Sequence, residues 1–391
     1  MPLFFLYLPQ QYITALKETA IYIHVPFCDH KCIYCDFYSI ISYENTSSYL
    51  QSLKKEISYY AEKYADDRKI ISIYFGGGTP SFMDPQYISQ ITEFVKKNFD
   101  VVMNAEVTLE TNPGTVSKEK LSEFKNIGIN RISIGIQSFN NDELKFLTRI
   151  HDSAAAIKTV YDANDSGFKN ISIDLIFNLP KQTKQKWLSN LETALQLPIK
   201  HISAYSLILE PGTILNKMVL DGKVKMQSDD YDAELYESAI DKLASHGFQQ
   251  YEVSNFSLPG YESIHNNAYW RYKDYLSFGT SAHSFVNGKR WWNFSSVKFY
   301  NDAANKNGNG IAGEEVPTDE QKLNEYVMLA LRSKGLDTTE LKNLFGDGWL
   351  SKNQSYILEL LQKQFLLQEN SYLRFTPKGY AVCDEILSNL K

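Results

Sequence analysis

The sequence has little cysteine, no long apolar run and no block of like charge. Only four of its 391 residues are cysteine, so the disulfide framework of a small secreted domain is not expected. A helix needs about 20 apolar residues to cross a bilayer, and no window of the sequence reaches that length. The net charge is -6, and without a basic cluster it gives no electrostatic footprint for nucleic acid. We therefore expect no transmembrane segment and no nucleic-acid partner, and we leave transient membrane contact open.

The N-terminus, MPLFFLYLPQ, is apolar over about eight residues but has no basic leader. It is too short for a secretory signal or a membrane span, and we expect residues 1–20 to form a segment packed on the domain that follows. Without a signal peptide, the thiols are expected in a reducing compartment, which favours thiolate chemistry over disulfides. The sequence thus predicts a cytoplasmic protein.

What the sequence does contain is a series of apolar, β-branched runs bounded by turn residues. The predicted strands are residues 21–27, 70–78, 105–113, 131–138, 170–180 and 201–210. These runs are nearly continuous in hydrophobicity, as expected for parallel strands buried on both faces. Amphipathic stretches between them predict helices, and Gly128, Gly167 and Gly247 suit their C-terminal caps. Six βα units over residues 21–247 predict an α/β fold with a partial (β/α)6 barrel, since a complete barrel needs eight.

The pattern changes after residue 247. Residues 248–315 combine a strand-like stretch, an irregular aromatic segment and the Asn/Gly-rich stretch NDAANKNGNGIAGEE, and they predict an aromatic extension followed by a linker. Residues 316–391 predict three helical stretches, a short strand and a final helix, which together suggest a winged-helix-like α+β domain. The charges of this last unit nearly balance, whereas DNA-binding winged helices present a basic face. We therefore favour a structural or protein-docking role for it.

Three of the four cysteines lie together in CDHKCIYCDF, directly after the first predicted strand. Cys28, Cys32 and Cys35 are thus expected on a loop at the carboxyl end of that strand, where barrel enzymes keep their reactive groups. Three interpretations compete: buried structural cysteines, a zinc site completed by a nearby histidine, and a [4Fe-4S] cluster with one iron left open. Buried cysteines have no reason to crowd on one turn, and zinc lacks a second pair of ligands, so the cluster is favoured. The fourth, Cys383, is expected to be a small buried hydrophobe.

A triple glycine follows the second predicted strand, in IYFGGGTP, and glycine lets the backbone approach a ligand closely. Alone it indicates little, because a tight turn explains it equally well. Together with the C-x3-C-x2-C spacing at the end of the first strand, it resembles the radical SAM family. In that family, the amino and carboxylate groups of S-adenosylmethionine bind the open iron of the cluster. The resemblance therefore implies that the missing ligand is the cosubstrate.

The later strands each carry a polar residue near the carboxyl end, namely Glu110, Gln137 and Asp174, and Arg149 follows on a helix. A carboxylate within an apolar run such as ISIDLIF is costly unless it is hydrogen-bonded or functional, and a structural network at the barrel rim is the alternative. The motifs YIHVPFC, FGGGTP, LETNP, IGIQSF and HN-x-x-YW resemble the coproporphyrinogen-dehydrogenase-like branch of the family over nearly the whole chain. By position, this resemblance implies contacts with cluster-bound S-adenosylmethionine for Tyr22, Gly77, Glu110 and Ile208. It places Gly78, Thr79, Gln137, Arg149 and Asp174 where decarboxylating members bind a second S-adenosylmethionine.

That branch contains two functional classes. One is the oxygen-independent coproporphyrinogen III dehydrogenase of porphyrin biosynthesis, which converts propionates to vinyls by radical decarboxylation; the other is a haem chaperone, which binds haem and transfers it to acceptor proteins. The dehydrogenases carry a further cysteine where this sequence has Phe37, and they have a long N-terminal extension, whereas about twenty residues precede the first strand here. The box HNNAYW (265–270) matches the chaperones. The resemblance thus implies a haem chaperone, with the dehydrogenase as the alternative, and leaves open whether the chain is an enzyme; no catalytic residue is assigned.

His265, in the HNNAYW box, is the candidate haem contact. Imidazole suits haem iron, but a lone histidine among aromatic residues is more often packed and hydrogen-bonded. Tyr269 and Trp270 either flank a porphyrin face or belong to the core. The alternative haem contacts are His24 and His283, and the cationic candidates for the propionates are Arg271 and Lys273.

Overall fold

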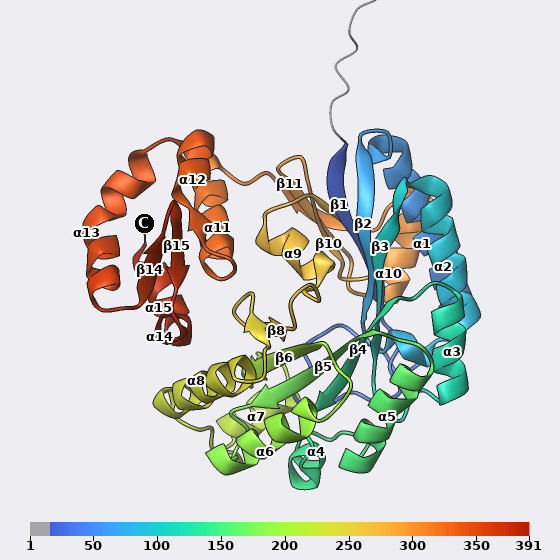
Figure 1. The fold of residues 1–391 in the computed structure, drawn as a ribbon. Coiled ribbons are helices and arrows are strands. Elements are labelled where there is room, and N and C mark those ends of the chain that lie inside the picture. The colour runs from blue at the N-terminus through green and yellow to red at the C-terminus, as the bar shows by residue number, and fades with distance from the viewer. Residues whose placement is uncertain (1–15, 391) are drawn as a thin grey trace, which may run out of the picture.

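Twelve strands form one curved sheet in the computed structural model, which describes residues 16–390 (Figure 1). Their order is β12-β11-β10-β9-β1-β2-β3-β4-β5-β6-β8-β7. Most of the predicted N-terminal segment lies outside the described residues. Within residues 16–390, no helix has the length and apolar character needed to span a bilayer.

The first six strands are parallel and follow one another in sequence order. They are β1 (Lys17–Val25), β2 (Arg68–Gly77), β3 (Val101–Thr111), β4 (Arg131–Gln137), β5 (Asn170–Phe177) and β6 (His201–Ser206). The helices between and after them are α1 (Thr46–Tyr64), α2 (Pro85–Asn98), α3 (Lys118–Asn126), α4 (Asn141–Phe146), α5 (Ser153–Asp165), α6 (Lys184–Leu195), α7 (Ile214–Leu220) and α8 (Asp229–Ala244), with a 3-10 turn at Pro80–Phe82. The predicted α/β fold with a partial (β/α)6 barrel is confirmed, and β1 and β3 begin four residues earlier than the sequence indicated.

Local capping explains where several of these helices begin. Asp84 precedes α2, and its Oδ1 accepts a hydrogen bond of 2.7 Å from the backbone N–H of Gln86, while Pro85 occupies the first helical position. Such caps satisfy backbone N–H groups that have no partner inside the helix. The apolar faces of these helices pack on the parallel strands, and this layer holds the main hydrophobic core. The core fixes the strands whose carboxyl ends carry the predicted site.

Residues 248–315 correct the sequence prediction, because they extend the sheet instead of forming a linker. This region contains β7 (Gln249–Gln250), β8 (Asn255–Ser257), α9 (Ile264–Trp270), β9 (Tyr275–Phe278), β10 (His283–Val286), β11 (Lys289–Asn293), α10 (Val297–Asn307) and β12 (Ile311–Glu315). β9 pairs in parallel with β1, and β10 to β12 continue the sheet in antiparallel fashion. The Asn/Gly-rich stretch is thus a helix and a strand. Its polar composition was misleading because α10 buries only one face, against α1.

A buried carboxylate ties this second half of the sheet to the barrel. Glu56 of α1 accepts hydrogen bonds from Tyr300 Oη at 2.7 Å, Asn293 Nδ2 at 2.7 Å and the backbone N–H of Gly279 at 2.9 Å. Burial raises the pKa of Glu56 to about 7. Because a buried carboxylate is costly unless its oxygens are bonded, this network fixes the position of residues 279–300 on α1.

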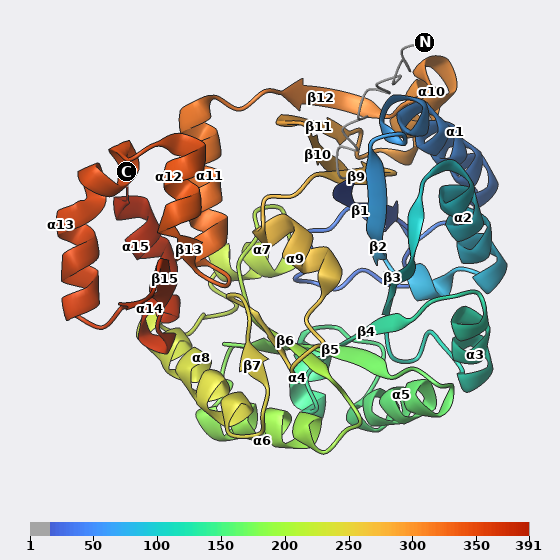
Figure 2. The same ribbon diagram turned by 45° about the horizontal axis from the view of Figure 1, so that its top comes forward.

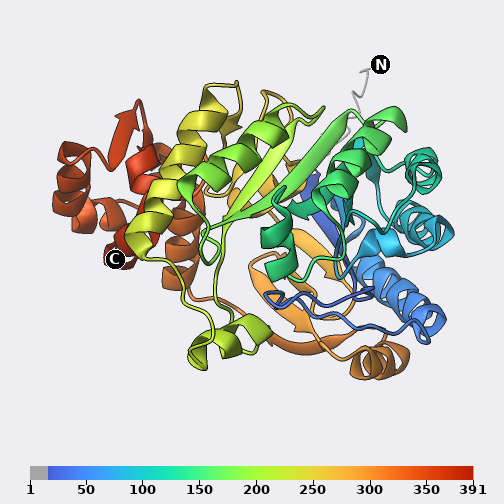
Figure 3. The same ribbon diagram turned by 90° about the horizontal axis from the view of Figure 1, so that it is seen from below.

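The C-terminal unit has its own hydrophobic core. It consists of α11 (Asp319–Leu331), β13 (Leu336–Asp337), α12 (Thr338–Phe345), α13 (Gly348–Gln362), β14 (Leu366–Glu369), β15 (Tyr372–Phe375), α14 (Pro377–Ala381) and α15 (Cys383–Asn389), with sheet order β13-β15-β14. The predicted final helix is divided in two at Val382. The unit lies at the open side of the barrel (Figure 2), and α14 packs on α8 (Figure 3). The domain boundaries at residues 247 and 315 stay predictions.

Candidate cluster and cofactor site

A cavity of about 900 Å³ lies between the carboxyl ends of the parallel strands and the C-terminal unit. It is lined by Cys28, Cys32, Cys35, Gly77, Gly78, Thr79, Glu110, Gln137, Arg149, Asp174 and Ile208, among others. Residues 380–385, from α14 and α15, form part of its wall. All three cysteines and most of the predicted cofactor residues therefore share one cavity, because parallel strands bring their carboxyl ends to the same edge of the sheet.

The three cysteines occupy the loop after β1. A bridge between Phe27 and Ile40 closes this loop, and the backbone N–H of Cys28 donates to Ile40 O at 3.0 Å. Cys28 is buried, and its Sγ lies 3.3 Å from Thr79 Oγ1, whereas Cys32 and Cys35 are half-buried. All four cysteines of the chain are free thiols. The loop thus presents three thiols to the cavity without a disulfide.

The donor set fits an iron–sulfur cluster better than a single metal ion. Burial raises the pKa of the Cys28 thiol and raises that of Cys35 to about 11, and metal coordination removes such a proton. In the described part of the chain, no three His, Cys, Asp or Glu side chains are arranged to hold one ion. A cluster makes no such demand, because its cysteines bind different irons. Arg149 Nη1 lies 3.5 Å from Cys32 Sγ and places a positive charge beside this cysteine.

The glycine motif holds the cysteine loop against the end of β2. The backbone N–H groups of Gly78 and Thr79 donate to Val25 O and Phe27 O, both at 2.8 Å. A Cβ at Gly78 would lie 2.7 Å from Phe27 O, and Gly77 has a φ of 108°. Side chains at these positions would separate the two segments. The glycines therefore have a packing role besides the ligand contact that the sequence predicts.

Glu110, at the end of β3, has an unusual environment for a carboxyl group. Tyr74 Oη donates to its Oε1 at 2.8 Å, and the backbone N–H of Gly77 donates to its Oε2 at 3.2 Å. Burial nevertheless raises the pKa of Glu110 to about 7. The group is thus poised between its two protonation states near neutral pH, and a nearby ligand ammonium would favour the ionised form.

A chain of hydrogen bonds connects the glycine motif to Arg149. Asn112 Nδ2 donates to Thr79 Oγ1 at 3.0 Å, and Arg149 Nη2 donates to Asn112 Oδ1 at 2.6 Å and to Gly135 O at 2.7 Å. Sequence reasoning missed Asn112, although its position in LETNP, two residues after Glu110, was a usable signal. This asparagine couples Thr79 to Arg149, the residue that approaches Cys32.

Gln137, the last residue of β4, and Asp174 of β5 also line the cavity. Gln137 has a φ of 70°, a left-handed backbone conformation that is uncommon outside glycine. Asp174 accepts a hydrogen bond of 3.3 Å from Ser133 Oγ, and burial raises its pKa. Buried polar groups that line a cavity without a full set of protein partners are suited to ligand contact.

His265, the candidate haem contact of the HNNAYW box, is buried within the protein. It is 2% exposed, does not line the cavity, and stacks on Tyr74 with ring centroids 4.8 Å apart. Its Nδ1 lies 3.1 Å from Ser72 Oγ and its Nε2 lies 2.9 Å from Tyr269 Oη. Burial lowers the pKa of His265 to about 3. Both ring nitrogens thus have protein partners in this structure, and a haem contact of His265 stays a prediction.

Tyr22 lies outside the cavity lining, whereas Phe37 belongs to it. Tyr22 does not line the cavity, and its Oη lies 3.1 Å from His24 Nδ1. His24 Nε2 lies 3.0 Å from Tyr38 O, so this histidine is also satisfied by the protein. Phe37 lines the cavity and is 63% exposed.

The residues of this cavity lie within the part of the chain that is similar to known proteins. The radical SAM superfamily model matches residues 22–194, which include the cysteine loop, the glycine motif and Glu110. The heme chaperone HemW of Lactococcus lactis is 34% identical over 95% of this chain and 96% of its own length. The chain belongs to the HemW family of radical SAM proteins. The HemW of Bacillus subtilis is 33% identical over 93% of this chain and 97% of its own length.

Membership in the HemW family implies a [4Fe-4S] cluster and S-adenosylmethionine as cofactors, which fits the three free thiols and the open cavity described above. Among solved structures, coproporphyrinogen III oxidase HemN from Escherichia coli superposes with a TM-score of 0.81. The match covers 96% of this chain and 90% of that chain at 22% sequence identity. It shows that the fold extends through the C-terminal unit.

Proposed function

We propose that this protein is a haem chaperone that binds haem and transfers it to acceptor proteins. The observation that carries the proposal is the similarity to the Lactococcus and Bacillus proteins, both named heme chaperone, over 95% and 93% of this chain. The similarity thus includes the C-terminal unit that walls the cavity. Acceptor proteins are the proposed partners, and a cytoplasmic location remains a prediction from the sequence.

Cys28, Cys32 and Cys35 are the proposed ligands of the cluster, and S-adenosylmethionine is proposed to complete the fourth iron. Their placement on one loop and at one cavity supports this assignment. A cluster bound by these cysteines would supply an electron for reductive cleavage of S-adenosylmethionine. The protein's part is to hold the thiols, to place Arg149 beside Cys32 and to restrict access through the loop.

The methionine end of S-adenosylmethionine is proposed to lie against Gly77, Glu110 and Ile208, all of which line the cavity. Tyr22 would support the glycine motif without lining the cavity, since its ring packs next to Gly76. The residues proposed for a second S-adenosylmethionine are Gly78, Thr79, Gln137, Arg149 and Asp174. A second S-adenosylmethionine and haem would compete if both occupy the same part of the cavity.

The wall of the cavity next to the C-terminal unit suits a porphyrin. It is lined by Tyr205, Leu207, Tyr236, Val253, Tyr380 and Val382. Aromatic and aliphatic side chains with a few polar groups are typical of sites for flat apolar ligands. We therefore place haem in this part of the cavity. Phe37 stands where the dehydrogenases have a further cysteine, and this supports the chaperone over the dehydrogenase.

The test is a haem titration of the anaerobically reconstituted protein, followed by absorbance, beside a coproporphyrinogen III turnover assay. We expect saturable haem binding, transfer of haem to apomyoglobin as a generic acceptor, and little or no protoporphyrinogen. Steady formation of protoporphyrinogen by the reduced protein with S-adenosylmethionine would favour the dehydrogenase instead.

A further inference from the structure

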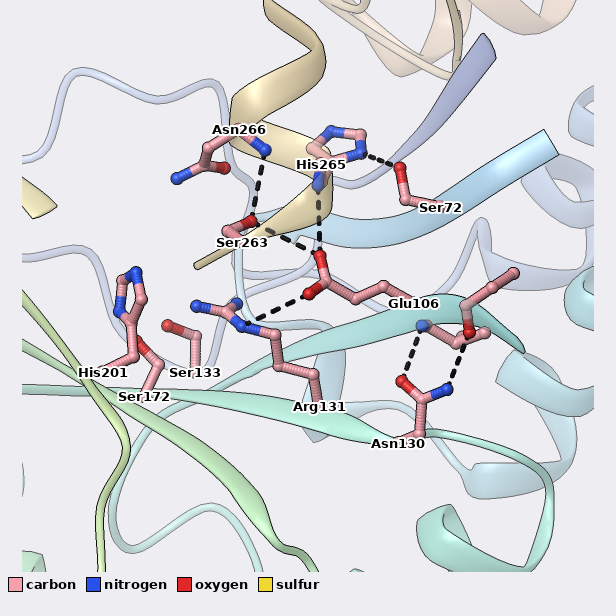
Figure 4. Close-up of polar contacts among 12 residues, drawn as sticks. Ser72, Glu106, Asn130, Arg131, Ser133, Ser172, His201, Ser263, His265 and Asn266 are labelled. Atoms are coloured by element: carbon pink, nitrogen blue, oxygen red, sulfur yellow. Dashed lines mark hydrogen bonds and ion pairs between the residues drawn. The ribbon is translucent and has the colours of Figure 1, made fainter. Parts of the chain in front are cut away.

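One arginine inside the barrel has no hydrogen-bonding partner. Arg131, the first residue of β4, is 2% exposed and lines the central cavity. Its one ion pair joins Nε to Glu106 Oε2 at 3.9 Å, which is too long for a hydrogen bond. No guanidinium nitrogen of Arg131 donates to another residue within residues 16–390. Figure 4 shows the guanidinium reaching past Glu106, with Nε nearest to the carboxylate.

Glu106 does not depend on Arg131 for its hydrogen bonds. Its Oε1 accepts from the backbone N–H of His265 at 3.1 Å and from Ser263 Oγ at 3.4 Å, both at the start of α9 (Figure 4). Arg131 is paired with this carboxylate by charge alone, because the 3.9 Å contact between Nε and Oε2 is too long for a hydrogen bond. A buried guanidinium whose N–H groups lack acceptors is costly even beside a carboxylate, and a ligand anion in the cavity would accept hydrogen bonds from them.

The other fully buried arginine of the described chain shows what a structural arginine looks like here. Arg68, the first residue of β2, is 1% exposed and does not line the cavity. Its Nη1 donates to Asp274 Oδ2 at 2.6 Å, and its Nη2 donates to Asn287 Oδ1 at 3.3 Å. Arg68 is thus fixed by the protein, whereas Arg131 has the same burial without the same bonds.

A second free donor faces the same cavity. Asn266, in the HNNAYW box, lines the cavity, and its side-chain amide has no hydrogen bond to another described residue. Its backbone N–H donates to Ser263 Oγ at 3.2 Å, which fixes the residue at the first turn of α9. In Figure 4 its side chain extends away from Ser263. An asparagine amide offers two N–H donors. The HNNAYW box therefore contributes to the cavity lining through Asn266 and not through His265.

We propose that Arg131 and Asn266 form a carboxylate-binding subsite at the floor of the cavity, which anchors a propionate of the bound porphyrin. This inference rests on the proposed haem-chaperone function. A guanidinium binds a carboxylate through two parallel N–H···O bonds, and its charge is retained in the barrel. Asp174 also lines the cavity, and burial raises its pKa.

S-adenosylmethionine also has a carboxylate, but its proposed place is at the other end of the cavity. Gln137, near that end, is the last residue of β4, and Arg131 is the first. The cysteine loop and the glycine motif likewise follow the carboxyl ends of their strands. The experiment therefore measures binding of both haem and S-adenosylmethionine, because each carries a carboxylate.

The experiment compares haem with haem dimethyl ester, whose propionates carry no charge, in titrations of the reconstituted wild-type protein and its variants. Arg131→Met should weaken haem binding on the order of tenfold to a hundredfold, as expected for loss of a charge-assisted pair. It should leave the affinity for the dimethyl ester within about twofold. Asn266→Leu should also lower the ratio of the affinity for haem to the affinity for the ester, but by less. Binding of S-adenosylmethionine in equilibrium dialysis should be unchanged.

Arg68→Met is the matched control, because it removes a buried arginine that lies outside the cavity; it should lower stability and leave the haem-to-ester ratio unchanged. If Arg131→Met does not fold, Arg131→Lys and Asn266→Leu give the same comparison. An equal loss for haem and its ester would overturn the subsite and leave Arg131 a structural residue. Weaker S-adenosylmethionine binding with unchanged haem binding would assign the subsite to methionine instead. Absence of haem binding by the wild type would overturn the proposed function itself, a result separate from any change in the ratio.

Discussion

At the mouth of the central cavity, the cysteine loop (residues 26–40) contains no helix or strand beyond the bridge between Phe27 and Ile40. At the floor, Arg131 of β4 lines the cavity, and Glu106 of β3 and His265 of α9 lie behind it; all three are at least nine-tenths buried. The mouth thus leaves its thiols free, while the floor is fixed by packing and by hydrogen bonds around Glu106 and His265. Because cofactor binding can supply the order that a loop lacks, we expect the mouth to depend on its cluster and the floor to be formed without any ligand.

Removal of one thiol from the cysteine loop should have the largest effect, and it tests whether the loop depends on its cluster while the floor does not. Cys28→Ala, Cys32→Ala or Cys35→Ala should each abolish the iron–sulfur absorbance after reconstitution, because each thiolate is expected to hold its own iron. The floor should stay folded, so circular dichroism should be unchanged. Cys383→Ala is the control and should keep the cluster. A protein that loses the cluster with Cys383→Ala and keeps it with Cys32→Ala would contradict the assignment.

At the floor, His265→Ala should act on stability and not on the cluster. The substitution removes a buried ring that is bonded to Ser72 and Tyr269, and it should lower the free energy of unfolding by about 2–4 kcal/mol. Denaturant titration gives this value. Tyr269→Phe removes only one of these bonds and should cost about 1 kcal/mol. A wild-type stability together with a changed Soret band would instead show that His265 binds haem iron.

Between mouth and floor, Glu110→Ala should weaken binding of S-adenosylmethionine. Loss of a charge-assisted contact is worth about 1–3 kcal/mol, measurable by equilibrium dialysis of the reconstituted protein. Glu56→Gln is the matched control, because Glu56 is also buried with a pKa raised to about 7 but does not line the cavity. It should change stability and leave the affinity alone. Equal affinity in wild type and Glu110→Ala would leave Glu110 a structural carboxylate.

The smallest expected effect is a pH dependence of the same binding step. Since burial raises the pKa of Glu110 to about 7, the carboxyl group is mostly protonated below that value and must ionise to pair with the ligand ammonium. Affinity should therefore rise with pH between roughly pH 6 and 8, by at most about tenfold per unit, and level off above. Glu110→Gln should remove this dependence. A flat profile in the wild type would show that the ammonium does not pair with Glu110.

The six parallel strands, the main helices of the barrel and the loop that carries the thiols can be predicted from local sequence patterns. These features depend on patterns within a short stretch of chain, because an apolar run such as 170–180 or a spacing such as that of Cys28, Cys32 and Cys35 has the same meaning wherever the chain goes. Capping residues such as Asp84 are equally local. This is why the fold class and the cysteine loop could be predicted without knowing any long-range contact.

Which polar groups have hydrogen-bond partners depends on long-range packing. His265 is bonded to Ser72, which lies 193 residues away along the chain, and no local pattern shows that contact. The stretch 301–315 became a helix and a strand because α1 covers its few apolar residues and β11 pairs with its end. Arg68 and Arg131 both begin a buried strand, yet only Arg68 finds Asp274 beside it. Partners such as these come from segments distant in sequence, so burial and hydrogen bonding at each site are properties of the packed chain and not of its local composition.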